Sequence, residues 1–419
     1  MSDQAWQDAC LGELIDTFEA GVSVRSTDGP AANSEHGVLK VSCVSREGFR
    51  PSENKLVIDE DLRRVGPSIS RGDLILTRAN TLELVGRAVT VDDDFPHLHL
   101  SDKHWRVVLQ EEKAAHLGWL KYMINSPRVR RALMVRATGT SGSMKNISQR
   151  EFLKIRVPYP PFDVQQRIHA VLEEWECANR QLEDLIAAKR CLKRGLMQQL
   201  LTGQRRFKEF DNGDPRKSTW FGNIPATWSY PAMEEIAVEV KMRAGPGFEK
   251  FSVISCTKYE GLVDSLEYFG KKVFGDDRSN YKVVERAHFA YPSNHIEEGS
   301  IGLLHHRDRG VVSPIYTVFE VTADVLPEYL YLVFKTEKCR HLFASGTNAS
   351  VNRRGSLRWR EFRKLRLPIP SRPEQEAIVT LARALQSELD LLRNLRNALD
   401  RQRRGVMELL LTGTVRVHT

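Results

Sequence analysis

The feature that most constrains this chain is that its second half repeats its first. Residues 150–160 read REFLKIRVPYP and residues 360–370 read REFRKLRLPIP, an offset of about 210 positions. The same offset carries Gly195 onto Gly405 and the segment LLTG at 200–203 onto LLTG at 410–413. Self-similarity at a fixed offset predicts one structural unit of about 210 residues built twice.

In each unit, a region of short strand-like runs precedes a long helical segment. In the first unit, runs bounded by Gly, Pro or Asp predict strands at residues 37–44, 73–77, 86–91 and 105–109, and a helix is predicted at 114–125. After a Pro-rich junction the helical pattern continues to a Gly stop at 203, weakened only by Gly195. We therefore predict an α+β fold with two tandem mixed α/β domains, at 1–160 and 206–370, each followed by a helix, at 161–205 and 371–419.

Both long helices carry residues at alternating spacings of three and four that form a mainly apolar series. In the first helix the series is Ile168, Val171, Trp175, Ala178, Leu182, Leu185, Lys189, Leu192, Leu196 and Gln199. In the second it is Ile378, Leu381, Leu385, Glu388, Leu392, Leu395, Leu399, Gln402, Val406 and Leu409. Sustained over about four heptads, this spacing is typical of a coiled coil. The alternative is that each helix packs only on its own domain.

Antiparallel pairing about a pseudo-twofold axis has one register in which the two charged seam residues meet. In this register Lys189 faces Glu388. The adjacent layers are Leu185–Leu392 and Leu182–Leu395. A slip of one heptad would place Lys189 against leucine and leave its charge without a partner. We therefore predict a Lys189–Glu388 pair that sets the register of a spacer about 60 Å long.

The composition is typical of a soluble intracellular protein with an anionic partner. Lys plus Arg total 62 against 54 for Asp plus Glu, a formal net charge of +8. The six cysteines form no C-x-x-C pair, which suits a reducing cytosol better than a zinc site or a disulfide framework. No apolar run reaches the roughly 20 residues that a membrane span needs. We therefore expect a cytoplasmic location and no membrane partner.

Motifs for catalysis are weak or missing. The string YPPF at 159–162 lacks the amide or acid that begins an adenine methyltransferase loop, and no G-x-x-x-x-G-K-S/T loop is present to bind ATP. Asp214 with Glu239 and Lys241 is a poor imitation of a nuclease cluster, because the leading proline is missing. Four histidines are explained more simply as surface or core residues than as metal ligands: His97, His99, His305 and His306. We therefore expect no catalytic residue, metal or cofactor on this chain.

The two junctions make a family recognisable. RVPYPPFDVQQRI at 156–168 and RLPIPSRPEQEAI at 366–378 each lead into a long helix ending LLTG. The first unit adds GDLIL at 72–76 and LSDK at 100–103. Over nearly its whole length the chain resembles the specificity (S) subunit of a type I restriction–modification enzyme. The second unit departs from the pattern, with AHFA at 287–290 in place of GDLI and RRGSLRW at 353–359 in place of a Lys-Asn loop.

The resemblance implies a non-catalytic, DNA-binding subunit. Residues 1–160 and 206–370 would be target-recognition domains 1 and 2, each reading one half of a split, asymmetric site on double-stranded DNA. The helices would set the unread spacer and dock two modification (methyltransferase) subunits and, for cleavage, two restriction subunits. S-adenosylmethionine would bind to the methyltransferase subunits, and ATP and Mg²⁺ to the restriction subunits. The assembled complex would be an adenine-specific DNA methyltransferase and an ATP-dependent endonuclease.

Other functions remain open at this stage. The chain could serve a complex that only methylates DNA, or a related phage-defence complex. It could be a self-contained DNA-modifying enzyme, which binding of S-adenosylmethionine by the isolated chain would indicate. It could also be a scaffold that bridges partners without touching DNA, in which case a footprint would show no two separated protected segments.

Base and phosphate contacts need basic, amide or small polar side chains, which loops can present to DNA. In the first domain the candidates for DNA contact are Arg78, Asn80, Arg87, Thr140, Lys145 and Asn146. In the second domain they are Ser293, Asn294, His295, Asn352, Arg353, Arg354 and Arg358. For each of the basic residues the competing interpretation is a solvated surface charge. If Arg353 and Arg354 contact phosphates, replacing both by alanine should flatten the salt dependence of DNA binding.

Overall fold

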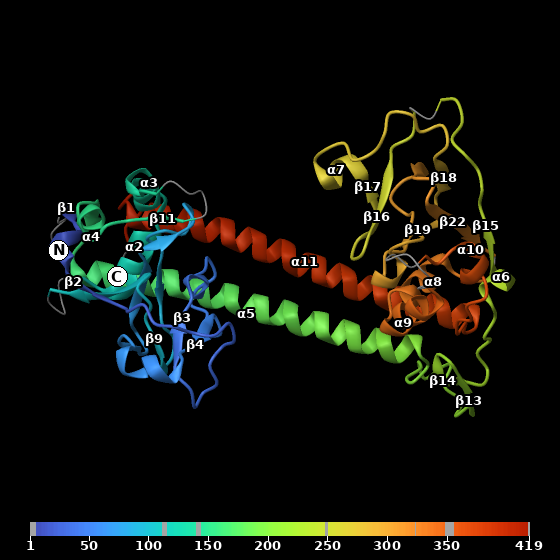
Figure 1. Cartoon of the computed structure of the whole chain (residues 1–419), viewed down its shortest axis with the longest axis horizontal. Coiled ribbons are helices and arrows are strands. Elements are labelled where there is room, and N and C mark those ends of the chain that lie inside the picture. The colour runs from blue at the N-terminus through green and yellow to red at the C-terminus, as the bar shows by residue number, and fades with distance from the viewer. Residues whose placement is uncertain are drawn as a thin grey trace. The chain divides into compact units, whose positions relative to one another are not determined.

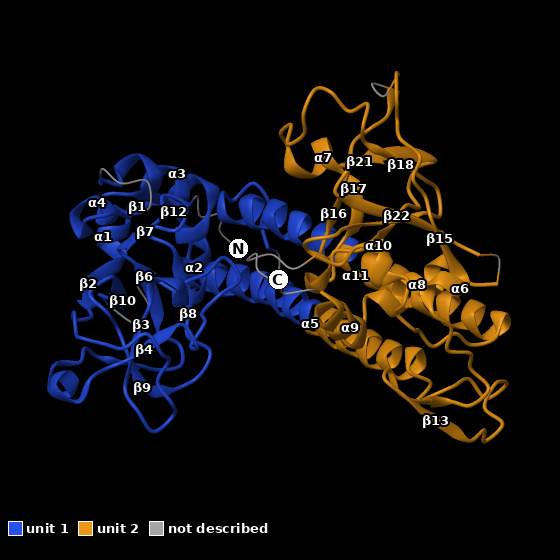
Figure 2. Cartoon of the chain, turned by 45° about the vertical axis from the view of Figure 1, so that its right-hand side comes forward, with its two compact units in different colours: residues 1–183, 394–419 blue, residues 184–393 orange. Residues whose placement is uncertain are grey.

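Two long helices run through both compact units of the molecule (Figures 1 and 2). The computed structural model describes residues 6–110, 115–139, 144–247, 250–322, 324–347 and 356–417. Helices α5 (Phe162–Leu201) and α11 (Arg372–Leu411) have 40 residues each. Unit 1 is formed by residues 1–183 and 394–419, and unit 2 by residues 184–393. Each unit therefore contains one half of α5 packed against one half of α11, which confirms the predicted fold class.

Unit 1 contains two four-stranded sheets. The first, antiparallel, has the order β2 (Ile15–Ala20), β10 (His104–Leu109), β6 (Leu74–Thr77), β8 (Ala88–Thr90). The second has the order β4 (Asn54–Leu56), β3 (Gly37–Leu39), β9 (Phe95–His99), β5 (Ser68–Ile69). Strand β1 (Gln7–Cys10) pairs with β12 (Arg156–Tyr159), and β7 (Ala79–Asn80) pairs with β11 (Lys145–Asn146). The helices are α1 (Leu11–Leu14), η1 (Val41–Cys43), η2 (Asp59–Arg64), α2 (Leu117–Asn125), α3 (Pro127–Arg136) and α4 (Gln149–Leu153).

Unit 2 is built around one four-stranded antiparallel sheet. Its order is β15 (Ala237–Glu239), β22 (Tyr316–Val321), β19 (Phe289–Pro292), β20 (Gly302–Leu303). Three hairpin or strand pairs accompany it: β13 (Arg216–Thr219) with β14 (Gly222–Pro225), β16 (Ile254–Thr257) with β17 (Gly261–Asp264), and β18 (Lys282–Glu285) with β21 (Arg309–Val312). The helices are α6 (Met233–Ile236), α7 (Ser265–Phe269), η4 (Ile296–Glu298), α8 (Pro327–Phe334), α9 (Glu337–Gly346) and α10 (Trp359–Phe362).

Most predicted elements of unit 1 are present, and one is wrong in part. The strands predicted at 73–77, 86–91 and 105–109 overlap β6, β8 and β10, and the helix predicted at 114–125 contains α2. The strand predicted at 37–44 ends at Leu39, because residues 41–43 form the 3₁₀ turn η1. In this turn Cys43 is fully buried and its Sγ lies 3.4 Å from Nε2 of His104. A tertiary contact therefore overrides the strand preference of this β-branched segment.

The two units share a sheet topology that their sequences barely show. The order β2-β10-β6-β8 in unit 1 corresponds to β15-β22-β19-β20 in unit 2, and both sheets are antiparallel throughout. In each unit the core includes residues from both long helices. Ile168 and Leu410 lie in the core of unit 1, and Leu200 and Ile378 lie in the core of unit 2. The repeat in the sequence is therefore also a repeat in the structure.

A buried glutamine fastens each long helix to its domain in the same way. Gln165 on α5 accepts a hydrogen bond from the backbone N–H of His116 (2.8 Å) and donates one to the carbonyl of Pro160 (2.9 Å). Its equivalent on α11, Gln375, accepts from the N–H of Leu326 (2.8 Å) and donates to the carbonyl of Pro370 (3.0 Å). Both side chains are almost fully buried. Each amide therefore satisfies two backbone groups that would otherwise be costly to bury.

A glycine is required just after each long helix, because the backbone makes a left-handed turn there and a tryptophan ring lies close to it. Gly203 has φ +64° and Gly413 has φ +72°. A Cβ at Gly203 would lie 3.3 Å from the ring of Trp228, and a Cβ at Gly413 would lie 3.2 Å from the ring of Trp6. The conformation ends the helix at no steric cost to glycine. Trp6 comes from the other end of the chain, so unit 1 is assembled from both termini.

The residues that line the seam between the helices differ from the predicted residues at every second position. The predicted residues Ile168 and Leu182 are buried, but Leu185 and Leu395 are 43% and 49% exposed. On the inward face the next residue along takes their place. These inward residues include Leu172, Asn179, Ile186, Lys193 and Leu200 on α5, and Ala382, Leu389, Arg403 and Leu410 on α11. The prediction failed at these positions because several of the inward residues are polar. A search for apolar residues at spacings of three and four therefore selected the residues next to them.

Candidate nucleic-acid interface

In unit 1, the structure brings four of the predicted DNA-contact residues together at one end of the main sheet. Arg78 follows β6 directly and is exposed. Strand β7 then pairs with β11, so that Lys145 lies opposite Asn80. The backbone N–H of Ile147 donates to the carbonyl of Arg78 (3.0 Å), which fixes this loop against the next segment. Arg78, Asn80, Lys145 and Asn146 therefore belong to one cluster.

Two candidates of unit 1 have roles inside the protein. Asn80 is only 9% exposed, and its Oδ1 accepts from the backbone N–H of Thr81 (2.8 Å). Arg87 donates through Nε to the carbonyl of Ser45 (3.0 Å) and through Nη2 to that of Arg46 (3.3 Å). Burial lowers the pKa of Arg87, and the neighbouring Arg46 lowers it further. We conclude that Arg87 is engaged in holding the 45–46 loop, which sequence spacing did not indicate.

In unit 2, the corresponding cluster forms at the same end of the corresponding sheet. Ser293 follows β19, the equivalent of β6, and is buried. The backbone N–H of Leu357 donates to the carbonyl of Ser293 (2.8 Å), as that of Ile147 does to Arg78 in unit 1. Arg358, the next residue, is exposed and lines a cavity of about 560 Å³ together with Ser293. Two predicted contacts far apart in sequence thus share one pocket.

Two further candidates of unit 2 line a neighbouring cavity. Asn294 and His295 contribute to a second cavity of about 560 Å³, which shares Ile315 and Tyr316 with the first. Nδ1 of His295 lies 3.5 Å from a carboxylate oxygen of Glu298. Four other candidates lie outside the described residues: Thr140, Asn352, Arg353 and Arg354.

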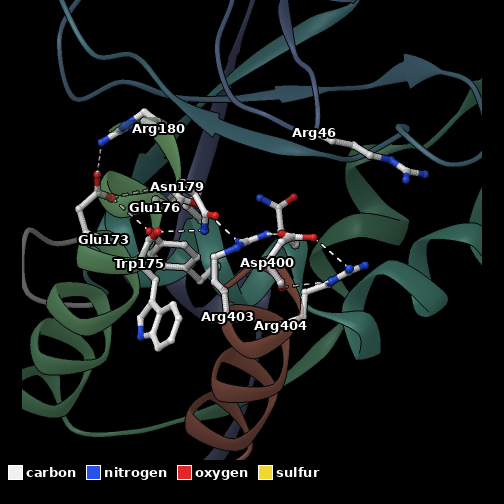
Figure 3. Close-up of polar contacts among 12 residues, drawn as sticks. Arg46, Glu173, Trp175, Glu176, Asn179, Arg180, Asp400, Arg403 and Arg404 are labelled. Atoms are coloured by element: carbon white, nitrogen blue, oxygen red, sulfur yellow. Dashed lines mark hydrogen bonds and ion pairs between the residues drawn. The ribbon is translucent and has the colours of Figure 1, made fainter. Parts of the chain in front are cut away.

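A polar network joins α5 and α11 in unit 1 (Figure 3). Arg403 on α11 lies 3.8 Å from Glu176 on α5 and 3.1 Å from Asp400. Glu176 also pairs with Lys121 (2.8 Å), whose side chain is only 8% exposed. The equivalent contact in unit 2 joins Lys193 to the amide oxygen of Gln386 (2.6 Å). This polar contact across the seam therefore recurs at equivalent positions in both units, although the sequence analysis predicted neither instance of it.

The charged residues of the predicted seam are in contact. Nζ of Lys189 lies 2.7 Å from Oε1 of Glu388, and the two side chains are 32% and 43% exposed. Because both groups remain partly in water, the pair contributes little stability, about 0.2–1 kcal/mol. The role of this pair in setting the register stays a prediction.

The chain has relatives among proteins of known type. No protein-family model matches it. The type I restriction enzyme EcoEI specificity subunit of Escherichia coli is 27% identical over 171 residues, which are 41% of this chain and 29% of that relative. The type I restriction enzyme MjaVIII specificity subunit of Methanocaldococcus jannaschii is 23% identical over 323 residues, which are 71% of this chain and 70% of that relative. This chain is a homologue of type I specificity subunits.

Two solved structures share the fold over nearly the whole chain. The S subunit of the type I restriction–modification system from M. genitalium has a TM-score of 0.55 at 14% identity, covering 98% of this chain and 97% of that one. A chain from a study of complex assembly and conformational transition in the type I R-M system has a TM-score of 0.58 at 12% identity, covering 99% and 100%. The paired-helix architecture with two mixed domains is therefore the fold of type I specificity subunits.

In this specificity-subunit homologue, the residues that imitate catalytic clusters have structural partners. Asp214 accepts from Arg206 (2.7 Å), which also pairs with the buried Glu374 (2.8 Å). Glu239 lies 3.4 Å from Lys241 at the end of β15. Asp214 and Glu239 are thus engaged in separate contacts rather than in one cluster.

The histidines considered as metal ligands also have other surroundings. His99 is mostly buried, its Nδ1 lies 2.9 Å from the carbonyl of Gly66, and its Nε2 lies 2.8 Å from Nδ1 of His36. Burial lowers the pKa of His99. In the described part of the chain, ligand atoms of His295, Glu297 and Glu298 lie within 4.8 Å of one another.

The described helices include none with the length and apolar character needed to cross a lipid bilayer.

Proposed function

We propose that this chain is the DNA-recognition subunit of a type I restriction–modification complex and reads a bipartite, asymmetric site. In this proposal residues 1–160 and 206–370 are the two target-recognition domains. The single observation that carries it is the pair of equivalent loop clusters. Each follows the third strand of its sheet, after β6 or β19, and is held by an equivalent backbone hydrogen bond. Equivalent positions with different side chains suit two domains that read two different sequences.

The chemistry of the two clusters supports this proposal. Unit 1 presents Arg78 and Lys145, whereas unit 2 presents Arg358 with small polar and amide groups at Ser293 and Asn294. Arginine and asparagine can read guanine and adenine edges in the major groove, and arginine and lysine both bind phosphates. The net charge of +8 favours association with the DNA polyanion.

The long helices supply the proposed docking surface for partner subunits. Leu185 and Leu192 are exposed on α5, and Leu391 is 66% exposed on α11. Large apolar side chains on a coiled coil are unfavourable in water unless a partner covers them. We infer that modification subunits, and restriction subunits for cleavage, bind to the chain along these helices or at their ends. S-adenosylmethionine would then be bound by the methyltransferase subunits, and ATP and Mg²⁺ by the restriction subunits.

The proposal is tested by mapping methylated sites in cells that carry this chain with its partner subunits. We expect a motif of two defined blocks separated by unspecified bases. Replacing Arg78 and Lys145 by alanine should relax or weaken recognition of one block only. Replacing Ser293 and Asn294 by alanine should affect the other block. Removing a side chain that reads a base should cost about 1–3 kcal/mol of binding free energy.

The matched control is the double substitution of Arg194 and Arg401 by alanine, since both residues are exposed on the long helices. It should leave the motif unchanged. A single contiguous motif, or equal effects of the two double variants on both blocks, would contradict bipartite reading. Protection of no DNA segment by the assembled complex would instead support the scaffold alternative.

A further inference from the structure

The cavity of about 560 Å³ that Arg358 lines is strongly basic. Its cations come from three separate segments of unit 2. They are Lys241 after β15, Lys282 at the start of β18, and Arg358, Arg360 and Arg363 around α10. The lining includes one carboxylate, Glu239. A volume of this size lies within the range of small-ligand sites, about 300–1,000 Å³.

Two of the cations form no ion pair with a carboxylate in the described part of the chain. Arg358 is exposed, and no described carboxylate lies within 4.0 Å of its guanidinium. Nζ of Lys282 donates to the backbone carbonyl of Tyr316 (2.5 Å) but forms no ion pair among the described residues. By contrast, Arg363 lies 3.4 Å from Glu234, and Arg360 lies 3.1 Å from Glu361. The positive charge of the pocket is therefore only partly neutralised.

The electrostatic surroundings of Lys282 favour the binding of an anion. Burial lowers the pKa of Lys282. The charge of Glu239 acts in the opposite direction, and the smaller effects of Arg243 and Lys241 lower the pKa further. Together these effects make the charged ammonium of Lys282 less favourable than it would be in water. A bound anion would reverse this effect, because an opposite charge within a few ångströms favours the charged form.

The walls of the pocket include an aromatic ring that is packed against the core of unit 2. Trp359 lines it and packs in the core against Phe319 (ring centroids 5.5 Å apart) and Phe362 (5.8 Å). Ser293 and Thr317, at the ends of the adjacent strands β19 and β22, add hydroxyl groups and are both buried. Cations, hydroxyl groups and a fixed scaffold together are the features of a site that holds a phosphate oxyanion.

We propose that this pocket binds a phosphate group, through Arg358 and Lys282 with support from Lys241. The phosphate can come from the backbone of duplex DNA or from a free nucleotide or pyrophosphate. For the DNA source, the inference rests on the proposed function and assigns this pocket as the backbone anchor of unit 2, beside the base-reading loop at 293–295. Anchoring at this point positions the loop and carries no sequence information itself.

The first arm of the test measures the salt dependence of duplex DNA binding by the full chain. Wild type and the variants R358A and R358K are compared with R194A, which changes an exposed arginine on α5 in the same unit. We expect R358A to reduce the slope of log K against log salt by about 0.9 for each phosphate it no longer binds, and to weaken binding similarly on duplexes of different sequence. R358K keeps the charge and should largely restore the slope, and R194A should not change it.

The second arm titrates the full chain with inorganic pyrophosphate and follows tryptophan fluorescence at constant ionic strength, with chloride as the control anion. We expect a saturable change that is lost in W359F and whose dissociation constant rises about ten-fold or more in R358A. The variant K282M serves as the second substitution, because it removes the charge and keeps the length of the side chain. Its circular dichroism should match that of wild type.

The two arms separate the two sources and the two proposals. A changed slope in the first arm assigns DNA as the source, and a response only to pyrophosphate assigns a free phosphate. If wild type fails to bind duplex DNA in the presence or absence of partner subunits, the proposed function fails, and the pocket then depends on the second arm. If wild type binds DNA but R358A and K282M change neither arm, the phosphate site is wrong and the proposed function stands.

Discussion

One buried histidine makes the stability of unit 1 depend on pH. His104 is fully buried on β10, with Nδ1 2.8 Å from Oγ of Ser101 and Nε2 3.4 Å from Sγ of Cys43. Burial lowers the pKa of His104 to about 4. In the unfolded chain the same ring takes up a proton near its ordinary pKa of about 6.5. Stability is therefore present above about pH 6.5 and is lost as the pH falls toward 4, because only the unfolded state gains the proton in that window.

The substitution H104Q tests this expectation. Between pH 7 and pH 5, His104 should account for about 2 kcal/mol of the loss in free energy of unfolding of unit 1. The variant lacks the titrating group, so its loss over the same range should be smaller by that amount, although it is less stable at pH 7. The measurement is urea unfolding at both pH values. H341Q, at an exposed histidine, is the control and should show the wild-type difference.

At the scale of the elements, glycines within and after the long helices have opposite effects on stability. A Cβ added at Gly195 or Gly405 would meet no atom within 4 Å. Both residues lie inside a helix, where glycine is unfavourable relative to alanine. At Gly203 the φ of +64° disfavours any side chain, and a Cβ would lie 2.4 Å from Cδ of Pro225.

We therefore predict that G195A and G405A each raise the free energy of unfolding by up to about 1 kcal/mol. G203A should lower it by about 1–3 kcal/mol, because backbone strain and a steric clash both act against the folded state. Thermal unfolding of the three variants checks the signs. A stabilised G203A, or a destabilised G195A, would show that the helix ends differ from this description.

The helix seam shows why element pairing was predictable but its details were not. Spacing of three and four indicated two long helices that pair, since this periodicity is a property of each helix alone. The antiparallel direction was inferred from two equal helices separated by a domain, in the register where Lys189 meets Glu388. The choice between Leu185 and Ile186 as the inward residue was not predictable, because inward positions also admit polar residues that find partners across the seam. Lys193, which bonds to Gln386, is one such residue.

At the scale of the whole molecule, unit 1 depends on the far end of the chain. Its core includes Met407, Leu410 and Leu411 of α11, which pack with Ile168 and Leu172 of α5. Unit 2 is continuous in sequence, from residue 184 to residue 393. Removal of one buried leucine commonly costs about 2–5 kcal/mol, roughly a third of the stability of a typical domain.

A chain that ends at Arg393 should therefore unfold in unit 1 and stay folded in unit 2. We expect limited proteolysis to degrade residues 6–183 rapidly and to leave a resistant fragment near residues 184–393. A chain that ends at Val417 is the control and should resist proteolysis as wild type does. Equal resistance of both units in the shortened chain would show that α11 is not needed to complete unit 1.

The sequence by itself determined the duplication, the two long helices, their antiparallel pairing and the resemblance to specificity subunits. These features are local motifs and periodicities, and they recur at a fixed offset. Only the tertiary structure decided that Arg87 holds a loop, that Gln165 and Gln375 fasten the helices, and that Lys241, Lys282 and Arg358 line one pocket. Such arrangements depend on contacts between segments tens of residues apart or more, and no spacing along the chain specifies which side chains those contacts bring together.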